Sequence, residues 1–478
     1  MVSLLIYFYT FVLLKSLPSY KVLRLVLLWS LLLCLTTGCM VRRIDHTPYR
    51  QTDYYHHTLQ EMEEEPPAIS AADSLQVGWA KVNITPPLNT PLAGYGKRKG
   101  LRYQEVHDSV WVRTFYFDNG HTQAVLVTLD MLIAPMTVAA ALEKEYAQLG
   151  LKPEQVYLTA THTHTSFGGW AKKLAGWLMA GRYSKQVVRE TTAHILQSIR
   201  EAKANRQPAR IGYGQVYAPQ VVANRLTGSL ADRDTALRFL KIQQSSGKTA
   251  VLCTFAAHPT ILPSMTTELS RDYPGELVDR LEQTVDFAAF AAGAVGSHRT
   301  VAPHGDTYKS TAAVGQRLAK AIAQQLPSVP LEQATSIGFA RHELELPEPQ
   351  WRLNATHRLA PFLFYGLFGK YPAYINSLQL GKTILLGVPA DYSGELLPPL
   401  EQQALRQGKH LLVTGFNGGY IGYITPDKYY QLKKYETRSM NFYGPHSGSY
   451  LNEILLKLLG QYNSEASQTD IVGNSSEN

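Results

Sequence analysis

Histidines follow two apolar segments that we predict to be buried strands. Residues 156–159 lead into His162 and His164, and residues 251–255 lead into His258. Imidazole is a common zinc ligand, although a histidine after a buried strand is more often a hydrogen-bonded structural residue. His162 and His164 alternate, so in an extended segment they would point to opposite sides. We therefore expect one of these two to bind the ion and the other to support it or transfer a proton.

Two further polar side chains follow predicted strands later in the chain. Asp391 comes shortly after residues 384–388, and Tyr423 follows residues 411–413 within a glycine-rich segment. Ligands of open α/β sheets bind at the carboxyl ends of strands. Two histidines, a carboxylate and a phenol meeting there would suit the roughly tetrahedral shell of zinc. Taken singly, Asp391 could cap a helix and Tyr423 is one of 28 tyrosines, so the prediction depends on the combination.

The elements around these motifs alternate between strand-like and helix-like patterns. Residues 125–129 form another apolar, β-branched run, and three segments show helical periodicity: 137–149, 187–202 and 311–326. Such alternation predicts an α/β fold, with a layered mixed β-sheet flanked by helices in a single large catalytic domain.

Five separate segments occur in an order that is typical of one enzyme family. They are Gly-Trp-Ala-Lys-Val-Asn-Ile-Thr-Pro at 78–86, His-Thr-His at 162–164, Phe-Ala-Ala-His-Pro at 255–259, Val-Pro-Ala-Asp-Tyr at 388–392, and the Gly-Phe-Asn run at 415–423. Over roughly residues 76–460 the chain resembles the neutral/alkaline, non-lysosomal ceramidases. The resemblance implies four zinc ligands: His162, His258, Asp391 and Tyr423.

The same resemblance implies roles for residues around the ion. His164 would lie close to the bound water and the substrate, and Arg225 would contact the substrate or the developing oxyanion, although a surface arginine is the alternative. With Tyr423, these two form the predicted catalytic set. We also expect Gly168, Gly169 and Tyr420 to contact the substrate, because glycine lets the backbone approach a ligand closely.

This set of residues suits zinc-dependent cleavage of an amide bond. Zinc lowers the pKa of bound water from about 15.7 toward 7, so that hydroxide can attack a carbonyl at neutral pH. His164 could pass a proton to the leaving amine. We expect a ceramide-like N-acyl sphingolipid as substrate. The alternatives are a metal-dependent hydrolase of another ester or amide, and a surface lipoprotein that keeps the fold without turnover.

Two positions depart from the family pattern. Asp391 stands where the family has a glutamate, one methylene longer. The family's active-site serine falls on Arg299 when the segments are compared without gaps, with Ser297 two positions earlier. We expect the first change to shift ligand geometry and the second to alter substrate positioning.

The N-terminus has the pattern of a bacterial lipoprotein signal. Residues 1–38 combine basic residues with apolar runs and end in Leu-Thr-Thr-Gly before Cys39. We predict a signal peptide over 1–38, lipidation of Cys39, a linker over 39–75, the hydrolase domain over 76–462 and a disordered tail over 463–478. An uncleaved membrane anchor is the alternative. Either case predicts a membrane-anchored protein of the cell envelope, periplasmic or surface-exposed.

Charge and apolar patterning limit the possible partners. The net charge is +8, and removing residues 1–38 removes three cations and no acid, which leaves +5. The sequence has no block of Lys and Arg residues of the kind that indicates a nucleic-acid site, so we expect no nucleic-acid partner. Two apolar segments, 170–183 and 360–374, could line an acyl-chain groove, rest on a membrane or belong to the core. We therefore expect a lipid or amphiphilic substrate and a membrane as partners.

Overall fold

The computed structural model of the chain describes residues 24–29, 40–228, 233–333 and 336–462. Cys39, most of the predicted signal peptide and the predicted tail over 463–478 lie outside these residues. Among the helices of the described part, none is long and apolar enough to cross a bilayer.

Two β-sheets form the centre of the fold. The larger sheet has the strand order β13-β11-β10-β8-β3-β5-β6-β7, and the smaller has the order β2-β15-β17-β18-β20. The strands of the larger sheet are β3 (Gln76–Asn83), β5 (Trp111–Asp118), β6 (Gln123–Leu129), β7 (Val156–Ala160), β8 (Gln207–Tyr217), β10 (Ala236–Gln244), β11 (Thr249–Phe255) and β13 (Phe287–Ala292). Those of the smaller sheet are β2 (Ala68–Ala71), β15 (Ser336–Glu343), β17 (Tyr374–Leu380), β18 (Thr383–Gly387) and β20 (His410–Thr414).

The two sheets pack face to face. Phe115, Leu126 and Leu252 of the larger sheet share one buried cluster with Phe339 and Leu385 of the smaller sheet. The burial follows from the period of two along a strand, which turns alternate side chains to the inner face. The opposite faces of both sheets are therefore left for helices to cover.

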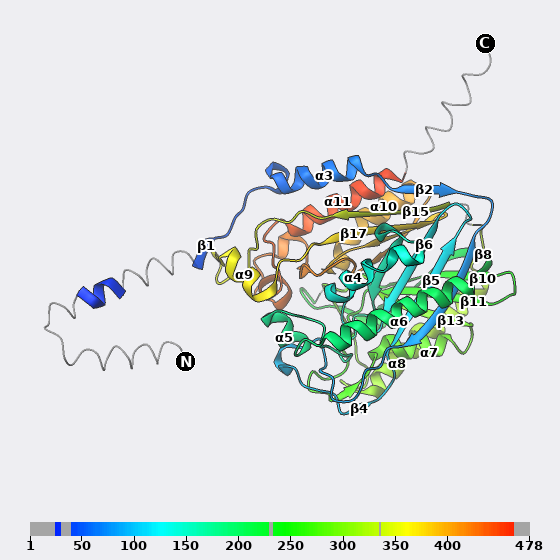
Figure 1. The fold of residues 1–478 in the computed structure, drawn as a ribbon, viewed down its shortest axis with the longest axis horizontal. Coiled ribbons are helices and arrows are strands. Elements are labelled where there is room, and N and C mark those ends of the chain that lie inside the picture. The colour runs from blue at the N-terminus through cyan, green and yellow to red at the C-terminus, as the bar shows by residue number, and fades with distance from the viewer. Residues whose placement is uncertain (1–23, 30–39, 229–232, 334–335, 463–478) are drawn as a thin grey trace, which may run out of the picture.

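Helices cover both outer faces, so the domain has four layers (Figure 1). Those over the larger sheet are α4 (Met136–Glu143), α6 (Lys185–Ala204), α7 (Asp272–Leu281) and α8 (Tyr308–Gln325). Those over the smaller sheet are α3 (Asp53–Glu64), α10 (Leu397–Arg406) and α11 (Ser447–Gln461). The predicted layered mixed sheet between helices is confirmed, with two sheets in place of one.

Three predicted helices correspond to α4, α6 and α8. The apolar stripe of α6 includes Val188, Ile195 and Ile199, which are buried against the larger sheet. The predicted helix over 137–149 is two elements, because α4 ends at Glu143 and a 3-10 turn, Tyr146–Leu149, follows it.

The prediction of a linker before residue 76 is wrong for residues 40–75. This region contains β1 (Val41–Arg43), α3 and β2. Tyr55, Thr58 and Met62 of α3 are buried. They lie three and four positions apart, which is one face of a helix, but the pattern is hard to recognise because Thr58 is polar and most neighbours are charged or polar.

The carboxyl ends of distant strands meet because the larger sheet curls. β13, at one end of the strand order, contacts β6 and β7 at the other end. The Thr128 hydroxyl of β6 donates to the Phe290 carbonyl of β13 at 2.6 Å. The smaller sheet joins them, since the Thr159 hydroxyl donates to the Gly415 carbonyl at 3.0 Å. Because β6–β7, β11–β13 and β18–β20 are parallel pairs, the loops after β7, β11, β18 and β20 converge.

Short strand pairs arrange the loops around this point. They are β4 (Glu105–Val106) with β12 (Glu268–Leu269), β9 (Val222–Asn224) with β14 (His298–Thr300), β19 (Asp391–Tyr392) with β21 (Tyr423–Ile424), and β1 with β16 (His357–Leu359). Two short helices, α5 (Leu174–Ala180) and α9 (Pro361–Phe368), lie outside the layers and contact each other.

Candidate metal centre

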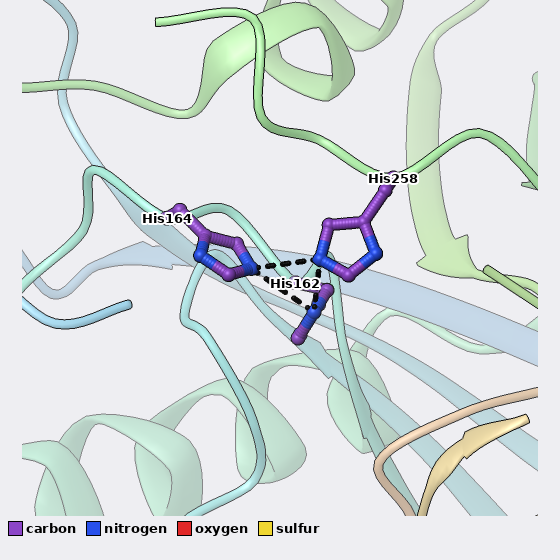
Figure 2. A group of neighbouring side chains, drawn as sticks. All are labelled: His162, His164 and His258. Carbon is purple, nitrogen blue, oxygen red and sulfur yellow. Dashed lines mark hydrogen bonds between the residues drawn. The ribbon is translucent and has the colours of Figure 1, made fainter. Parts of the chain in front are cut away.

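Three histidine side chains point a nitrogen at one common position (Figure 2). The Nε2 atom of His162 is 3.0 Å from that of His258 and 3.1 Å from that of His164. The Nε2 atoms of His164 and His258 are 2.9 Å apart. All three side chains are buried. The cluster is therefore a candidate metal site.

Backbone carbonyls fix the orientation of two of these rings. The Nδ1 atom of His162 lies 2.6 Å from the Leu132 carbonyl oxygen, and that of His164 lies 2.9 Å from the Gly94 carbonyl oxygen. A carbonyl oxygen can only accept, so both Nδ1 atoms carry the proton. In the neutral rings both Nε2 lone pairs then point into the cluster, which is the arrangement that a metal-binding imidazole requires.

The expectation that His162 and His164 point to opposite sides is wrong. It assumed an extended backbone, but His162 has a φ of 60°, in the left-handed region. This turn brings both rings to the same side. The ring of Phe416 stacks on His162 at a centroid distance of 3.8 Å and holds it there.

Burial favours the uncharged forms of the His164 and His258 imidazoles. It lowers the pKa of His164 and of His258 well below the usual value, and the charges of His162 and Arg225 act in the same direction. A tetrahedral zinc ion with bonds of about 2.0–2.1 Å would separate two ligand nitrogens by roughly 3.3 Å. The observed separations of 2.9–3.1 Å are close to this spacing, so the donor set fits a cation.

Asp391 adds a carboxylate to the cluster. Its Oδ1 atom is 3.3 Å from the His162 Nε2 atom and 3.7 Å from the His258 Nδ1 atom. Within the described part of the chain, this buried oxygen has no hydrogen-bond partner. The other oxygen, Oδ2, accepts from the Tyr420 hydroxyl at 2.7 Å. One oxygen is thus held in place while the other stays available to a cation.

Tyr423 and Arg225 complete the polar floor. Tyr423 lies opposite Asp391 in the β19–β21 pair, and the Arg225 Nη2 atom donates to the Tyr423 hydroxyl at 3.0 Å. Burial raises the pKa of the Tyr423 phenol well above its usual value, and Arg225 opposes that rise. Arg225 also forms an ion pair with Glu436 at 2.9 Å. Its side chain is only 18% exposed, so the alternative of a surface arginine is wrong.

A largely apolar cavity of about 590 Å³ opens above the floor. Both apolar segments from the sequence contribute to its wall. The contributing side chains are Trp170 and Met179 from the first segment, and Phe364, Phe368 and Tyr371 from the second. The reading of these segments as core alone is therefore wrong. Polar donors at the bottom of an apolar cavity are typical of a small-molecule site.

Comparisons with known proteins point to one family. Residues 75–307 match the model of the family described as neutral/alkaline non-lysosomal ceramidase, N-terminal. The family resemblance is confirmed. A neutral ceramidase of Mycobacterium tuberculosis is 24% identical over 241 residues, which cover 46% of this chain and 37% of that protein. The matched region thus spans little more than a third of the Mycobacterium tuberculosis protein.

Two solved ceramidase structures share the fold. The neutral ceramidase of Pseudomonas aeruginosa superposes with a TM-score of 0.70 at 18% identity, over 82% of this chain and 75% of that one. A ceramidase complexed with C2 gives the same TM-score at 17% identity, over 82% and 76% of the two chains.

Two ceramidase-motif residues that we expected at the substrate lie elsewhere. Gly168 and Gly169 are buried and do not line the cavity. A Cβ atom on Gly168 would lie 2.0 Å from the Ala180 carbonyl oxygen, and the Gly169 amide donates to that oxygen at 2.6 Å. These glycines therefore dock the end of α5 onto the histidine loop. Tyr420, by contrast, does line the cavity.

The departure at the family's serine position is also visible. Arg299 is exposed and does not line the cavity. Ser297 is buried, with its Oγ atom 2.6 Å from that of Ser393, and it does not reach the cavity either. Neither Arg299 nor Ser297 is among the cavity-lining residues, so neither takes the place of the family's serine.

Two supporting residues were not predicted from the sequence. Phe416 lies within the glycine-rich motif, but nothing in the motif indicates that its ring packs on His162. Glu436, the partner of Arg225, lies in a separate loop with no recognisable signal. The carbonyls of Leu132 and Gly94 could not have been found from side-chain types at all.

Proposed function

We propose that this protein is a zinc-dependent amidase that cleaves the N-acyl bond of a ceramide-like lipid. The observation that carries the proposal is the buried cluster of three imidazoles, with the Asp391 carboxylate beside it, at the floor of an apolar cavity. The ceramidase family match supports the lipid amide as substrate class.

Following the ligand set that the ceramidase resemblance implies, four residues would hold the ion, and the third imidazole of the cluster, His164, would act on water and substrate. His162 and His258 supply imidazole nitrogens, and Asp391 supplies its unpartnered Oδ1 atom. Tyr423, paired with Asp391 across β19 and β21, supplies a phenol oxygen. When bound, zinc supplies a nucleophilic water at neutral pH.

The remaining polar groups position the amide and move its proton. The Arg225 guanidinium, held by Glu436 and Tyr423, donates to the carbonyl oxygen as negative charge develops there. The Nε2 atom of His164 accepts a proton from the attacking water and returns it to the departing amine nitrogen. The Gly94 carbonyl keeps the Nδ1 atom of His164 protonated throughout, so only Nε2 exchanges protons. The C–N bond breaks, and a fatty acid and an amine leave.

The cavity wall determines which substrates fit. A volume of about 590 Å³ falls within the roughly 300–1,000 Å³ that small-molecule sites usually occupy. Trp170, Met179 and Phe368 make its wall apolar, which favours an acyl chain over a peptide or a sugar.

We also propose that the protein is a lipoprotein of the cell envelope. The basis is the sequence Leu-Thr-Thr-Gly-Cys at residues 35–39. Labelling of growing bacteria with a palmitate analogue should mark the wild-type chain and leave Cys39→Ser unlabelled. Equal labelling of both chains would contradict the assignment, and an unlabelled wild type would favour an uncleaved anchor.

A hydrolysis screen tests the catalytic proposal. The full chain is stripped of metal with a chelator and assayed on ceramide, on an acyl ester and on a peptidoglycan amide, with and without added zinc. We expect equimolar fatty acid and sphingoid base from ceramide with zinc alone. If zinc-dependent cleavage is seen only with the ester or the peptidoglycan amide, that compound would replace ceramide as the proposed substrate. Zinc binding without cleavage of any substrate would indicate that the protein keeps the fold for binding alone.

A further inference from the structure

An exposed apolar surface lies beside the cavity and is not part of it. On α5, the side chains of Leu174, Trp177 and Leu178 are 48%, 45% and 37% exposed, and on α9 Phe362 is 57% exposed. None of the four lines the cavity. Because α5 and α9 contact each other, these side chains form one surface, which we call the α5–α9 face. Large apolar residues gathered at one place on a surface mark an interaction site.

The chain segments that carry and flank α5 and α9 contain charges of a single sign, and the nearby acid Glu348 is paired with Arg358 at 2.9 Å. Residues 96–102 and 170–185 around α5 carry cations and no acid, among them the exposed Lys97, Lys99 and Lys172. Residues 360–372 around α9 carry Lys370 and no acid. An apolar centre with a basic margin is the composition that binds anionic bilayers, because lysines near the surface are attracted to the anionic headgroups.

The N-terminal segment joins the domain next to this face. The Ala360 amide, one residue before α9, donates to the Met40 carbonyl oxygen at 2.9 Å. β1 pairs with β16 directly before α9, and Figure 1 shows β1, α9 and α5 at the same end of the molecule. The apolar run over 25–35 and Cys39 therefore precede the chain's entry into the domain at this end. Any anchor in residues 1–39 would hold the α5–α9 face toward the membrane.

We propose that the α5–α9 face is a second membrane contact that seats on an anionic lipid surface. The same two helices supply Met179, Phe364 and Phe368 to the cavity wall, so seating them would place the cavity at the bilayer. An anchor before the domain holds only one end of the chain. The α5–α9 face would add a second point of contact and so orient the domain on the bilayer.

Quenching of Trp177 by brominated lipids tests the contact without any need for turnover. The full chain carrying Trp29→Phe is reconstituted into vesicles of acyl-brominated phosphatidylcholine and phosphatidylglycerol, and its tryptophan emission is compared with that in unbrominated vesicles. Trp29→Phe removes the tryptophan of the N-terminal segment from the signal. We expect clear quenching, which falls when Trp177→Phe is added, with Trp170 in the cavity wall and Trp351 beside Phe368 as the sources of any remaining signal.

Matched variants make the result specific. Trp79 lies on β3 of the larger sheet, so adding Trp79→Phe should leave the quenching intact. Adding Phe362→Asp, on α9, should reduce it while Trp177 remains. Vesicles of brominated phosphatidylcholine alone should quench less. Quenching that is absent, or unchanged by Trp177→Phe, would overturn the membrane contact. Equal quenching in neutral vesicles would overturn the role of the basic margin. Because no cleavage is measured, these outcomes do not depend on the hydrolysis screen.

Discussion

The floor of the cavity and the α5–α9 face beside it, which we call the rim, are built in opposite ways. At the floor, His162, His258 and Asp391 are buried, and loops at the ends of four strands and a neighbouring aromatic ring fix their positions. At the rim, α5 and α9 lie outside the layers and present Trp177 and Phe362 to the surroundings. Chemistry that needs fixed atoms is placed on the rigid sheets, whereas contact with a soft lipid surface needs only apolar side chains. Changes at the floor should therefore affect every substrate, and changes at the rim only substrates held in a membrane.

The largest effect should come from removing a proposed ligand. His162→Ala or His258→Ala should lose the zinc bound by wild type, about one ion per chain. Activity should fall by more than the roughly 10–100-fold that follows from removing a group that merely supports a ligand. Metal analysis after gel filtration and an assay on soluble and vesicle-borne substrate check this. Full zinc occupancy in both variants would show that the floor is not the metal site.

His164 separates the two roles that its geometry allows. His164→Ala should keep its zinc and lose about 10²–10⁴-fold in turnover, because general acid–base catalysis typically contributes that much. His410→Ala, a change on β20 outside the floor, is the control and should behave as wild type in both assays. Loss of zinc from His164→Ala would instead make His164 a third imidazole ligand.

A substitution at Gly94 tests whether catalysis requires His164 to be held in place. A Cβ atom on Gly94 would lie 2.7 Å from the His164 Cα atom, and Gly94 has a φ of 114°. A misplacement of about 1 Å can cost 10²-fold, so Gly94→Ala should lose activity of that order. Gly120→Ala is the matched control, because its φ of 87° imposes backbone strain in open space. Similar kcat values for the two variants would contradict the positioning argument, and their Tm values report the shared strain.

A smaller effect is expected from the hydroxyl that supports Asp391. Tyr420→Phe removes the hydrogen bond to Oδ2 and should weaken zinc binding by about 10–100-fold. Tyr443→Phe also alters the cavity wall and should leave zinc affinity unchanged. Titration against a fluorescent zinc chelator measures both. Equal affinities would mean that Asp391 needs no such support.

The smallest effect should come from a single charge at the rim. Lys172→Gln should weaken partitioning onto phosphatidylglycerol vesicles by roughly fivefold, the equivalent of about 1 kcal/mol per lysine. Lys248→Gln, in the turn between β10 and β11, is the control for net charge. Vesicle co-sedimentation at two salt concentrations measures the difference. An identical loss in both variants would assign the effect to net charge rather than to the α5–α9 face.

The sequence predicted the elements of the fold better than their arrangement. Buried strands such as β7 and β11 are apolar runs that local pattern reveals, and α6 has a regular apolar stripe. The second sheet was missed because its separation from the first depends on packing between residues as distant as Phe115 and Phe339. Helix α3 was missed because its buried face includes Thr58.

Motifs at strand ends indicated which residues to group at the floor, and the structure brings those side chains together. What sequence could not supply was backbone geometry. In an extended strand, His162 and His164 would point to opposite sides. The positive φ of His162 turns both side chains to the same side instead. Gly168 and Gly169 were assigned to the substrate because glycine permits close approach, but the group that approaches is the Ala180 carbonyl.

Zinc X-ray absorption of the metal-loaded full chain tests the central claim most directly. We expect a shell of nitrogen and oxygen at about 2.0–2.1 Å with the scattering pattern of imidazole, and loss of part of that pattern in His258→Ala. Sulfur at about 2.3 Å, or a wild-type spectrum without imidazole, would contradict a zinc site at the floor of the cavity.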